Sequence, residues 1–378
     1  MRILIVTDNY THPTISGNRK CILEQMNLLK ELGIDVYFLH LQTGFKLTLS
    51  HTETKKYWGN HFFEYKLDLY HLLLERLINL YRKKISKWTW KANDACIGNV
   101  CKYINRLNLQ YKFDACIIQY YWLYKIAEKI NIQKTALMTH DCFSYKNLAL
   151  GLQCYRSTTP NEEAKALQSI KHIFAIQYEE AVFFKKLAPK SLIYTIYSKY
   201  QFNKQPIKLN PNILFFSGPN DFNLNGIHWF ITEIFPLVRK RNPSIKLIIG
   251  GGISNKICDK YSELNIEFKG YVENPADFYE LGNIVINPVY QGTGLKIKTF
   301  EALSFGKVVL AHPHSAEGIF NKESAPIFFS ENPHEWADFI NRIIVDEEMI
   351  LMHQQQACQY ICELNEYITN EYKRFLQY

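Results

Sequence analysis

The sequence lacks the features that mark several large classes of protein. Its nine cysteines are scattered and never spaced as CxxC, which argues against a disulfide framework and against a zinc site. No run of apolar residues is long enough to span a bilayer, and no block has the composition of a disordered segment. We therefore expect a chain that folds throughout, most simply in a reducing cytoplasm.

The beginning and the length of the chain set further limits. The chain opens on MRILIVTDNY, in which one basic residue precedes a short apolar run without a cleavage site, so we expect no signal peptide. Its 378 residues are too many for one compact core. We predict an N-terminal domain over 1–204, a C-terminal domain over 205–360, and a helix over 361–378 that can return to the first domain.

Apolar strands that alternate with helical patterns predict two doubly wound α/β domains. In the first half, strands are expected at 2–8, 35–41, 113–119, 135–140, 172–177 and 191–197, with helical patterns at 21–33 and in the basic, aromatic region before residue 113. After a polar linker at 198–212 the pattern restarts, with strands at 212–218, 245–252, 266–272, 284–289, 308–313 and 325–330 and helices at 226–242 and 295–306. Ligands are expected at the carboxyl ends of the strands, in a cleft between the domains.

The stretch GTGLKIKTFEALSFGK, residues 292–307, is the most informative. It follows a predicted strand, and a helix expected from Leu295 would leave the backbone N–H groups of residues 294–298 unpaired, which makes an anion site. Lys296 and Lys298 oppose the helix dipole there unless a polyanion binds.

Glu301 stands in the apolar run of the same helix, where a carboxylate needs partners such as two vicinal sugar hydroxyls. The alternative is a glycine-rich turn before a basic helix, with Glu301 paired to a structural lysine. The spacing of the residues alone leaves both interpretations open.

GTGLKIKTFEALSFGKVVLA, followed by SAEGI at 315–319, resembles the donor-site segment of the group 1 glycosyltransferases, and its GTGLK form resembles a subset of that family. The resemblance extends back through 215–251 and 266–294, and it is looser in the first half. It implies an α/β GT-B fold, with two Rossmann-like doubly wound domains facing across a cleft. It also implies a retaining, hexosyltransferase-like enzyme that moves a sugar from a nucleotide-diphosphate sugar to a saccharide or lipid-linked saccharide in bacterial surface polysaccharide synthesis.

The resemblance assigns roles to individual residues of the second half. Glu301 matches the glutamate that holds the ribose hydroxyls, whereas Thr293 replaces the glutamate that normally binds the transferred sugar, so the donor sugar stays open. Lys296 replaces a glycine of the cradle and is expected to be the main cation for the diphosphate. Asn220 and Asn225 replace the usual arginine and lysine, and plain turn and capping chemistry is their alternative. The predicted donor site also includes Tyr271, Val272, Gly294, Leu295, Ile297 and Lys298.

In the first half the resemblance is partial. Gly17 matches a glycine that lets the backbone approach the donor phosphates, and Arg19 or Lys20 could reach them too; a helix N-terminus without ligand is the alternative. His140 matches a histidine that touches the transferred sugar, and its alternative is a structural histidine followed by a helix cap at Asp141.

Glu179 and Glu180 resemble polar site residues, or else residues of a first helical turn that the dipole favours.

The segment 75–91 carries six basic residues with interleaved aromatic ones. It fits a solvated helix face, a contact with an anionic membrane at the cytoplasmic face of the inner membrane, or a lipid-linked acceptor. No nucleic-acid module is visible, so a nucleic-acid partner is not expected.

No DxD motif and no His/Asp ligand cluster is present, so metal-independent catalysis is expected, with no cofactor besides the nucleotide-sugar donor. Two other functions remain open. The first is a nucleotide-sugar epimerase or hydrolase. The second is a catalytically silent GT-B scaffold, which the missing glutamate and the two asparagines favour.

Overall fold

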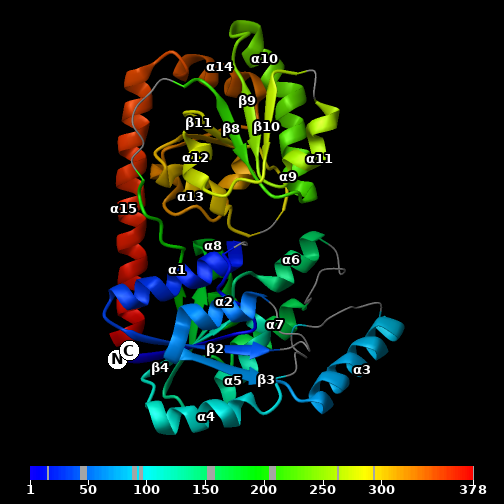
Figure 1. Cartoon of the computed structure of the whole chain (residues 1–378), viewed down its shortest axis with the longest axis vertical. Helices are drawn as coiled ribbons and strands as arrows, with labels where there is room; N and C mark the ends of the chain where they lie inside the picture. The colour runs from blue at the N-terminus through cyan, green and yellow to red at the C-terminus, as the bar shows by residue number, and fades with distance from the viewer. Residues whose placement is uncertain are drawn as a thin grey trace. The chain divides into compact units, whose positions relative to one another are not determined.

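The computed structural model describes residues 1–14, 17–42, 49–86, 92, 97–150, 158–203, 210–261, 264–292 and 294–377. By its internal contacts the chain divides into two compact units (Figure 1). Unit 1 comprises Met1–Lys199 together with the chain from Ile368 onwards, and unit 2 comprises Tyr200–Tyr367.

Unit 1 is built on a parallel sheet in the order β3-β2-β1-β4-β5-β6-β7. Its strands are β1 (Arg2–Thr7), β2 (Asp35–Gln42), β3 (Phe62–Lys66), β4 (Ala115–Gln119), β5 (Lys134–Met138), β6 (His172–Ala175) and β7 (Leu192–Thr195). The central strands are buried on both faces, which explains their continuous apolar sequence. The chain winds from β1 toward β3 and then from β4 toward β7, so the two directions separate between β1 and β4.

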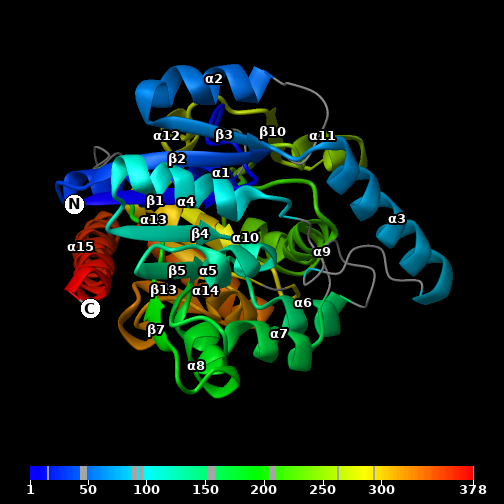
Figure 2. The same ribbon diagram turned by 90° about the horizontal axis from the view of Figure 1, so that it is seen from below.

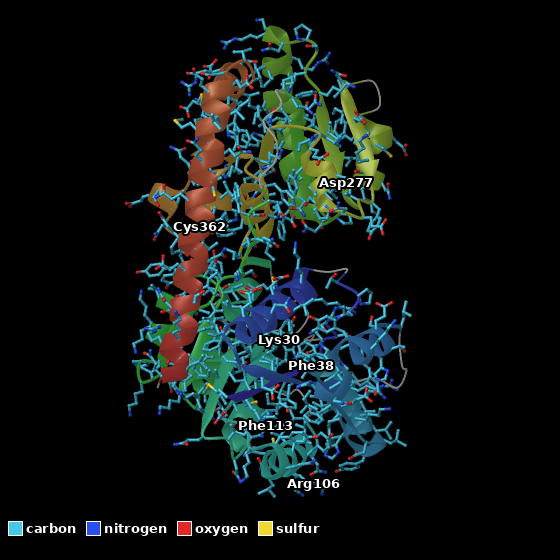
Figure 3. The ribbon with its side chains drawn as sticks, turned by 60° about the vertical axis from the view of Figure 1, so that its left-hand side comes forward. Lys30, Phe38, Arg106, Phe113, Asp277 and Cys362 are labelled. Atoms are coloured by element: carbon cyan, nitrogen blue, oxygen red, sulfur yellow. The ribbon has the colours of Figure 1, made fainter. Side chains whose placement is uncertain are left out.

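The helices of unit 1 connect these strands. They are α1 (Gly17–Glu31), α2 (Leu49–Trp58), η1 (Gly59–His61), α3 (Leu69–Ser86), α4 (Val100–Tyr111), η3 (Tyr121–Leu123), α5 (Tyr124–Lys129), α6 (Phe143–Leu150), α7 (Pro160–Leu167) and α8 (Tyr178–Leu187). Phe38 of β2 is fully buried and stacks on Trp58 of α2, whose ring also lies 4.0 Å from the Lys30 ammonium of α1; Phe38 and Lys30 are labelled in Figure 3.

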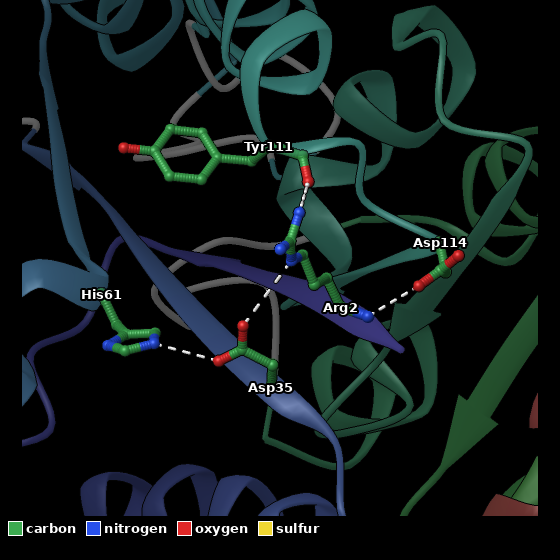
Figure 4. A network of polar contacts seen from close by, with 5 residues as sticks. All are labelled: Arg2, Asp35, His61, Tyr111 and Asp114. Atoms are coloured by element: carbon green, nitrogen blue, oxygen red, sulfur yellow. Dashed lines mark hydrogen bonds and ion pairs between the residues drawn. The ribbon is translucent and has the colours of Figure 1, made fainter.

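A polar network fastens the amino-terminal edge of this sheet (Figure 4). The Arg2 N–H donates to Asp114 at 2.7 Å and its guanidinium donates to the Tyr111 carbonyl at 2.8 Å. Asp35 lies 3.7 Å from the same guanidinium and 3.0 Å from His61. These groups are half exposed, so they contribute little stability. Their position leaves the opposite, carboxyl edge for a ligand.

Unit 2 is built on a second parallel sheet, in the order β10-β9-β8-β11-β12-β13. Its strands are β8 (Ile213–Phe216), β9 (Leu247–Gly250), β10 (Ile266–Gly270), β11 (Ile284–Asn287), β12 (Val308–Ala311) and β13 (Ile327–Phe329). Its helices are α9 (Asp221–Trp229), the π-helical turn η4 (Phe230–Ile234), α10 (Phe235–Arg241), α11 (Ser254–Ile257), η5 (Cys258–Lys260), α12 (Pro275–Tyr279), α13 (Ile297–Ser304), η6 (Pro313–Ala316), η7 (Lys322–Ser324) and α14 (Pro333–Ile343). Trp336, one of the largest fully buried side chains, packs against Trp229 and Phe230.

The last helix, α15 (Glu347–Gln377), supplies residues to both units. In unit 1, Glu371 accepts a hydrogen bond from the Thr195 N–H at 2.9 Å. Phe375 is fully buried and meets the rings of Phe174 and Tyr194 edge-on. The end of α15 is therefore part of the core of unit 1.

Three sequence predictions need correction. The strand β3 was not expected, because FFEYK is short and contains two charged residues. Helix α9 begins at Asp221 rather than at residue 226, because the Asn220 side chain caps it by accepting the Asn223 N–H. Helix α13 begins at Ile297 rather than at Leu295.

Candidate functional site

The candidate site of unit 2 lies where the winding direction of its sheet reverses. β8 and β11 are neighbours, and the chain proceeds from them toward opposite edges of the sheet. Ligands of open parallel sheets bind beyond the carboxyl ends of the strands at such a switch point. The segments that follow these two strands are 217–220 and 288–296.

Lys298 of α13 reaches this point. Its ammonium donates to Asn223 Oδ1 at 2.8 Å and to Ser217 Oγ at 3.3 Å, and it lies 4.9 Å from the centre of the Phe215 ring. Both oxygen partners are neutral. Burial, assisted by the charge of Lys296, lowers the pKa of Lys298 to about 7. Neither of these two partners carries a negative charge that would balance the ammonium. A bound anion would supply that charge.

The neighbours of Lys298 are themselves fixed. The Asn223 amide nitrogen donates to the Gly218 carbonyl at 3.0 Å, which turns its Oδ1 toward the lysine. The Asn223 N–H donates to Asn220 Oδ1 at 2.9 Å. Asn220 therefore acts as the helix cap that its alternative interpretation anticipated, and Asn225 lies exposed on α9. A donor contact of either asparagine stays a prediction.

Lys296 is directed differently from Lys298. Its ammonium donates to the Gly294 carbonyl at 3.1 Å, back along its own loop. Gly294 has a φ of 75°, a conformation that most other residues would adopt only with strain. The prediction that the N–H groups of residues 294–298 are all unpaired is wrong, because the Ile297 N–H donates to the Leu295 carbonyl at 3.0 Å.

Glu301 lies one turn beyond Lys298 on α13. It accepts a hydrogen bond from the buried Tyr279 hydroxyl at 3.3 Å, and the Tyr279 ring stacks on Phe305 with 4.6 Å between centroids. Burial, followed by the charge of Glu301, raises the pKa of Tyr279 well above its usual value, so the hydroxyl keeps its proton and donates. The neutral Tyr279 hydroxyl thus orients the Glu301 carboxylate through one of its two oxygens.

Two further features shape this edge of unit 2. A Cβ on Gly226 would lie 2.9 Å from the Pro288 carbonyl oxygen, so the glycine permits α9 to approach the end of β11. Tyr271, which follows β10, is 80% exposed, and Val272 beside it is half-buried. An exposed aromatic ring at the carboxyl edge can stack on a planar base.

In unit 1, the carboxyl ends of β4 and β5 hold His140. Its Nε2 lies 2.7 Å from the Gln119 amide oxygen, and Gln119 in turn donates to Gln25. An amide oxygen only accepts, so Nε2 carries the proton and Nδ1 is left as an acceptor. Burial lowers the pKa of His140 to about 3, and the ring is therefore neutral.

The backbone around His140 is strained. His140 has a φ of 65° and Tyr120 a φ of 79°, and their rings stack with 4.1 Å between centroids. Such conformations cost on the order of 1 to 2 kcal/mol each and are retained where surrounding structure enforces them. Tyr120 also stacks on Trp122, whose indole N–H donates to Asp8 beyond β1 at 2.9 Å. This cluster occupies the switch point of the first sheet, between β1 and β4.

Buried carboxylates hold the turn that follows His140. Glu163 accepts the Phe143 and Ser144 N–H groups, both at 3.0 Å, at the start of α6. Burial raises the pKa of Glu163. Asp141 is instead paired with Lys146 at 2.6 Å. The helix N-terminus is thus satisfied by Glu163, and the cap expected at Asp141 is an ion pair.

The other candidate site residues of the first half differ from one another in burial. Glu180 is buried, accepts from Gln177 at 3.1 Å, and has a pKa raised well above its usual value by burial and by Asp141, whereas Glu179 is exposed. Gly17 is exposed and opens α1.

The Arg19 guanidinium bonds two carbonyls of its own loop, those of His12 and Pro13, and the Ser50 hydroxyl. It serves the loop between β1 and α1, and Lys20 beside it is exposed.

Thr293 and Lys87 lie outside the described residues, as does the side chain of Lys83. Within the described ranges, no group of three or more His, Cys, Asp or Glu side chains could hold a metal ion. A search of the same ranges found no helix with the length and hydropathy needed to cross a bilayer.

Sequence reasoning missed several residues of these sites. Ser217 and Asn223 carried no signal beyond their place in the loop and helix after β8, and Tyr279 lies in a separate helix. Tyr120 could not be predicted as part of the site, because nothing in the sequence indicates a positive φ at a tyrosine. The period of α13 would have shown that Lys298 and Glu301, three residues apart, lie on the same side of the helix.

Comparisons with known proteins bear on the family and on the fold. Residues 210–346 match the family model described as Glycosyl transferases group 1. A Klebsiella pneumoniae protein described as an uncharacterized 44.6 kDa protein in the cps region is 31% identical over 121 residues, which cover 29% of this chain and 31% of that relative.

Two solved structures resemble the chain over nearly its whole length. A mutant of S. aureus TarM, in complex with fondaparinux, alpha-GlcNAc-glycerol and UDP, is 12% identical with a TM-score of 0.67, covering 100% of both chains. Anabaena Alr3699/HepE in complex with UDP-glucose is 13% identical with a TM-score of 0.63, covering 99% of this chain and 100% of the other. Residues 210–346 are thus similar to the group 1 glycosyl transferases, and the chain as a whole has the GT-B fold of two Rossmann-like domains, as the sequence predicts.

Proposed function

We propose that the protein is a nucleotide-sugar glycosyltransferase whose donor binds at the switch point of unit 2. The observation that carries the proposal is Lys298, an ammonium held by two neutral oxygens where β8 and β11 end. A diphosphate would supply the missing negative charge. The structures of similar proteins that contain UDP or UDP-glucose support this choice of ligand.

The remaining donor contacts follow from the geometry around Lys298. Glu301 lies three residues further along α13 and offers its carboxylate to the ribose hydroxyls, while Tyr279 holds it in place. Tyr271 and Val272, which follow β10, contact the base in this proposal, and the exposure of the Tyr271 ring supports it. Lys296, Leu295 and Gly294 surround the diphosphate as the loop, in the manner of the GTGLK subset. Thr293 is left to contact the transferred sugar, and we propose that it helps to select it.

The reaction we propose is a retaining transfer. The bond between the anomeric carbon and the diphosphate oxygen breaks, and its electron pair leaves on the nucleoside diphosphate. An acceptor hydroxyl oxygen bonds the same carbon on the same face, and its proton passes to a phosphate oxygen. Protonated Lys298 stabilises the charge that grows on the leaving group. We propose that neutral His140 also takes part in the transfer, with Nδ1 as a hydrogen-bond acceptor.

We further propose that the acceptor is a saccharide or lipid-linked saccharide of bacterial surface polysaccharide synthesis. The similarity to a protein of a Klebsiella cps region supports this choice. A lipid-linked acceptor would bring the protein to an anionic membrane, with residues 75–91 in contact. Metal-independent, hexosyltransferase-like chemistry is part of the same proposal.

A donor screen tests the proposal. Release of nucleoside diphosphate is measured from a panel of nucleotide sugars, with and without saccharide acceptors. We expect one donor to be consumed, and the variants Lys298→Met and Glu301→Ala to lose that activity. Lys240→Met, at an exposed position of α10, is the matched control and should keep it.

The alternatives give different results in the same screen. Acceptor-independent conversion of the donor would indicate an epimerase or hydrolase. Absence of nucleoside diphosphate release from every donor would indicate the silent scaffold and refute the proposal.

A further inference from the structure

Helix α3 carries an unusual surface. Seven large apolar side chains on this one helix are between 38% and 69% exposed: Leu69, Tyr70, Leu73, Leu74, Leu77, Leu80 and Tyr81. Globular proteins seldom leave a contiguous apolar surface of this kind in water unless something covers it. The exposed leucines begin at Leu69, before the basic segment 75–91. Most of the basic residues of that segment follow the last exposed leucine of α3, Leu80.

The exposed apolar residues share one side of α3, and the exposed Lys84 near the end of the helix falls on the same side. At about 100° per residue, all seven fall within about 140° of the helix circumference. Leu72, on the other side, is buried. His71 and its neighbour Asp68 form the first-turn contact, in which the His71 N–H donates to the Asp68 carboxylate at 3.0 Å. Asp68 thus caps the first turn of α3, and the helix has one exposed apolar side and another side that carries the buried Leu72.

Figures 1 and 2 agree on the course of α3. In both views it extends away from the sheet of unit 1, beyond the edge strand β3, over its 18 residues. A helix of that length measures about 27 Å. Its apolar side is accordingly presented along several turns rather than at a single point.

The charges of α3 indicate which kind of partner can cover its apolar side. The helix contains four basic residues, Arg76, Arg82, Lys83 and Lys84, and one acidic residue, Glu75. Two copies of such a helix would repel each other when paired side by side. An anionic lipid surface meets both properties, because acyl chains receive the leucines and headgroups attract the lysines and arginines.

We propose that α3 is an interfacial membrane helix, which inserts the side bearing Leu73, Leu77 and Leu80 into an anionic phospholipid bilayer and lies parallel to it. This inference deepens the membrane contact of the proposed function: the contact is mainly apolar, and it begins at Leu69. It also places the enzyme where a lipid-linked acceptor is found.

Vesicle flotation of the full-length protein tests this inference. Vesicles of phosphatidylcholine with 30% phosphatidylglycerol are compared with phosphatidylcholine alone, at low salt and at high salt. We expect the wild type to float with the anionic vesicles and to retain part of its binding at high salt. The triple variant Leu73→Ser, Leu77→Ser, Leu80→Ser should lose at least tenfold in partitioning. Leu109→Ser, at an 83% exposed leucine of α4, is the matched control and should bind as the wild type.

Three results would overturn the inference. The triple variant could bind as tightly as the wild type, or high salt could abolish binding altogether. The wild type could also form a dimer in solution that the triple variant does not, which would assign the apolar side to a second copy. Nucleoside diphosphate binding is measured on the wild type and on each variant, so that a wild type that binds nucleotide but not anionic vesicles refutes only this inference and not glycosyl transfer.

Discussion

Replacement of Lys298 gives the sharpest prediction. The ammonium is expected to contact the donor diphosphate, and in the free protein burial holds its pKa at about 7, below the usual 10.5. A diphosphate restores the charged form, so the pKa of Lys298 rises on binding and a proton is taken up. Affinity is then full below pH 7 and falls as the pH rises through the pKa of the free protein.

The size of this effect follows from the pKa. If the lysine of the complex stays protonated, the dissociation constant rises in inverse proportion to the fraction of the free protein in which Lys298 is protonated. Between pH 7.0 and pH 8.5 this gives an increase of about 16-fold. The terminal phosphate, with a pKa of about 6, is already ionised over this range. At pH 7, removal of the charged hydrogen bond by Lys298→Met should weaken binding roughly tenfold to a hundredfold.

Isothermal titration calorimetry with ADP, GDP, UDP and dTDP measures both quantities. The tightest nucleotide is titrated at the two pH values, in buffers of different ionisation enthalpy that report proton uptake. Lys298→Arg, which keeps its charge throughout, should bind without this pH dependence, and Lys296→Met should retain it. A wild-type dissociation constant that stays constant from pH 7.0 to 8.5, or a Lys298→Met variant that binds like the wild type, would refute the reasoning.

Three further predictions concern other residues of the two sites. Glu301→Ala should weaken nucleoside diphosphate binding by roughly tenfold or more, and Tyr279→Phe by less, as measured by the same calorimetry; equal affinity of Glu301→Ala and wild type would exclude the ribose contact. Gly226→Ala should lower the free energy of unfolding by about 1 to 3 kcal/mol in a urea titration, because the added Cβ would meet the Pro288 carbonyl. Gly218→Ala, with open space around the added Cβ, should leave the free energy of unfolding unchanged. Equal urea midpoints for the two variants would contradict the close approach of α9. His140→Asn, which tolerates the positive φ, should reduce transfer at least about a hundredfold in the donor assay while leaving nucleotide affinity unchanged, and full activity would remove His140 from the site.

The sequence predicts the fold well where apolar runs are continuous. The central strands of both sheets are buried on both faces, so their sequences are apolar throughout and easily seen. The edge strand β3 escaped prediction because half-buried edge positions admit glutamate and lysine. The start of α9 was misplaced because a cap at Asn220 outweighs the glycine that follows it.

The site was predictable in place but not in detail. The loop and helix of 292–307 do lie at the switch point, as their position after β11 requires. Which lysine reaches the neighbouring loop depends on the backbone at Lys296, whose ψ of 75° precedes the first helical residue and directs its ammonium back to Gly294. Ser217 and Tyr279 are distant from α13 in sequence. They contact Lys298 and Glu301 because of the order of the strands in the sheet, which the sequence does not show directly. The exposure of the apolar side of α3 is visible only in the structure.

A crystal structure with the tightest nucleoside diphosphate tests the central claim most directly. We predict that the terminal phosphate lies within hydrogen-bonding distance of the Lys298 ammonium and that the ribose hydroxyls contact the Glu301 carboxylate. A nucleotide bound elsewhere, or with its phosphates turned away from Lys298, would contradict it.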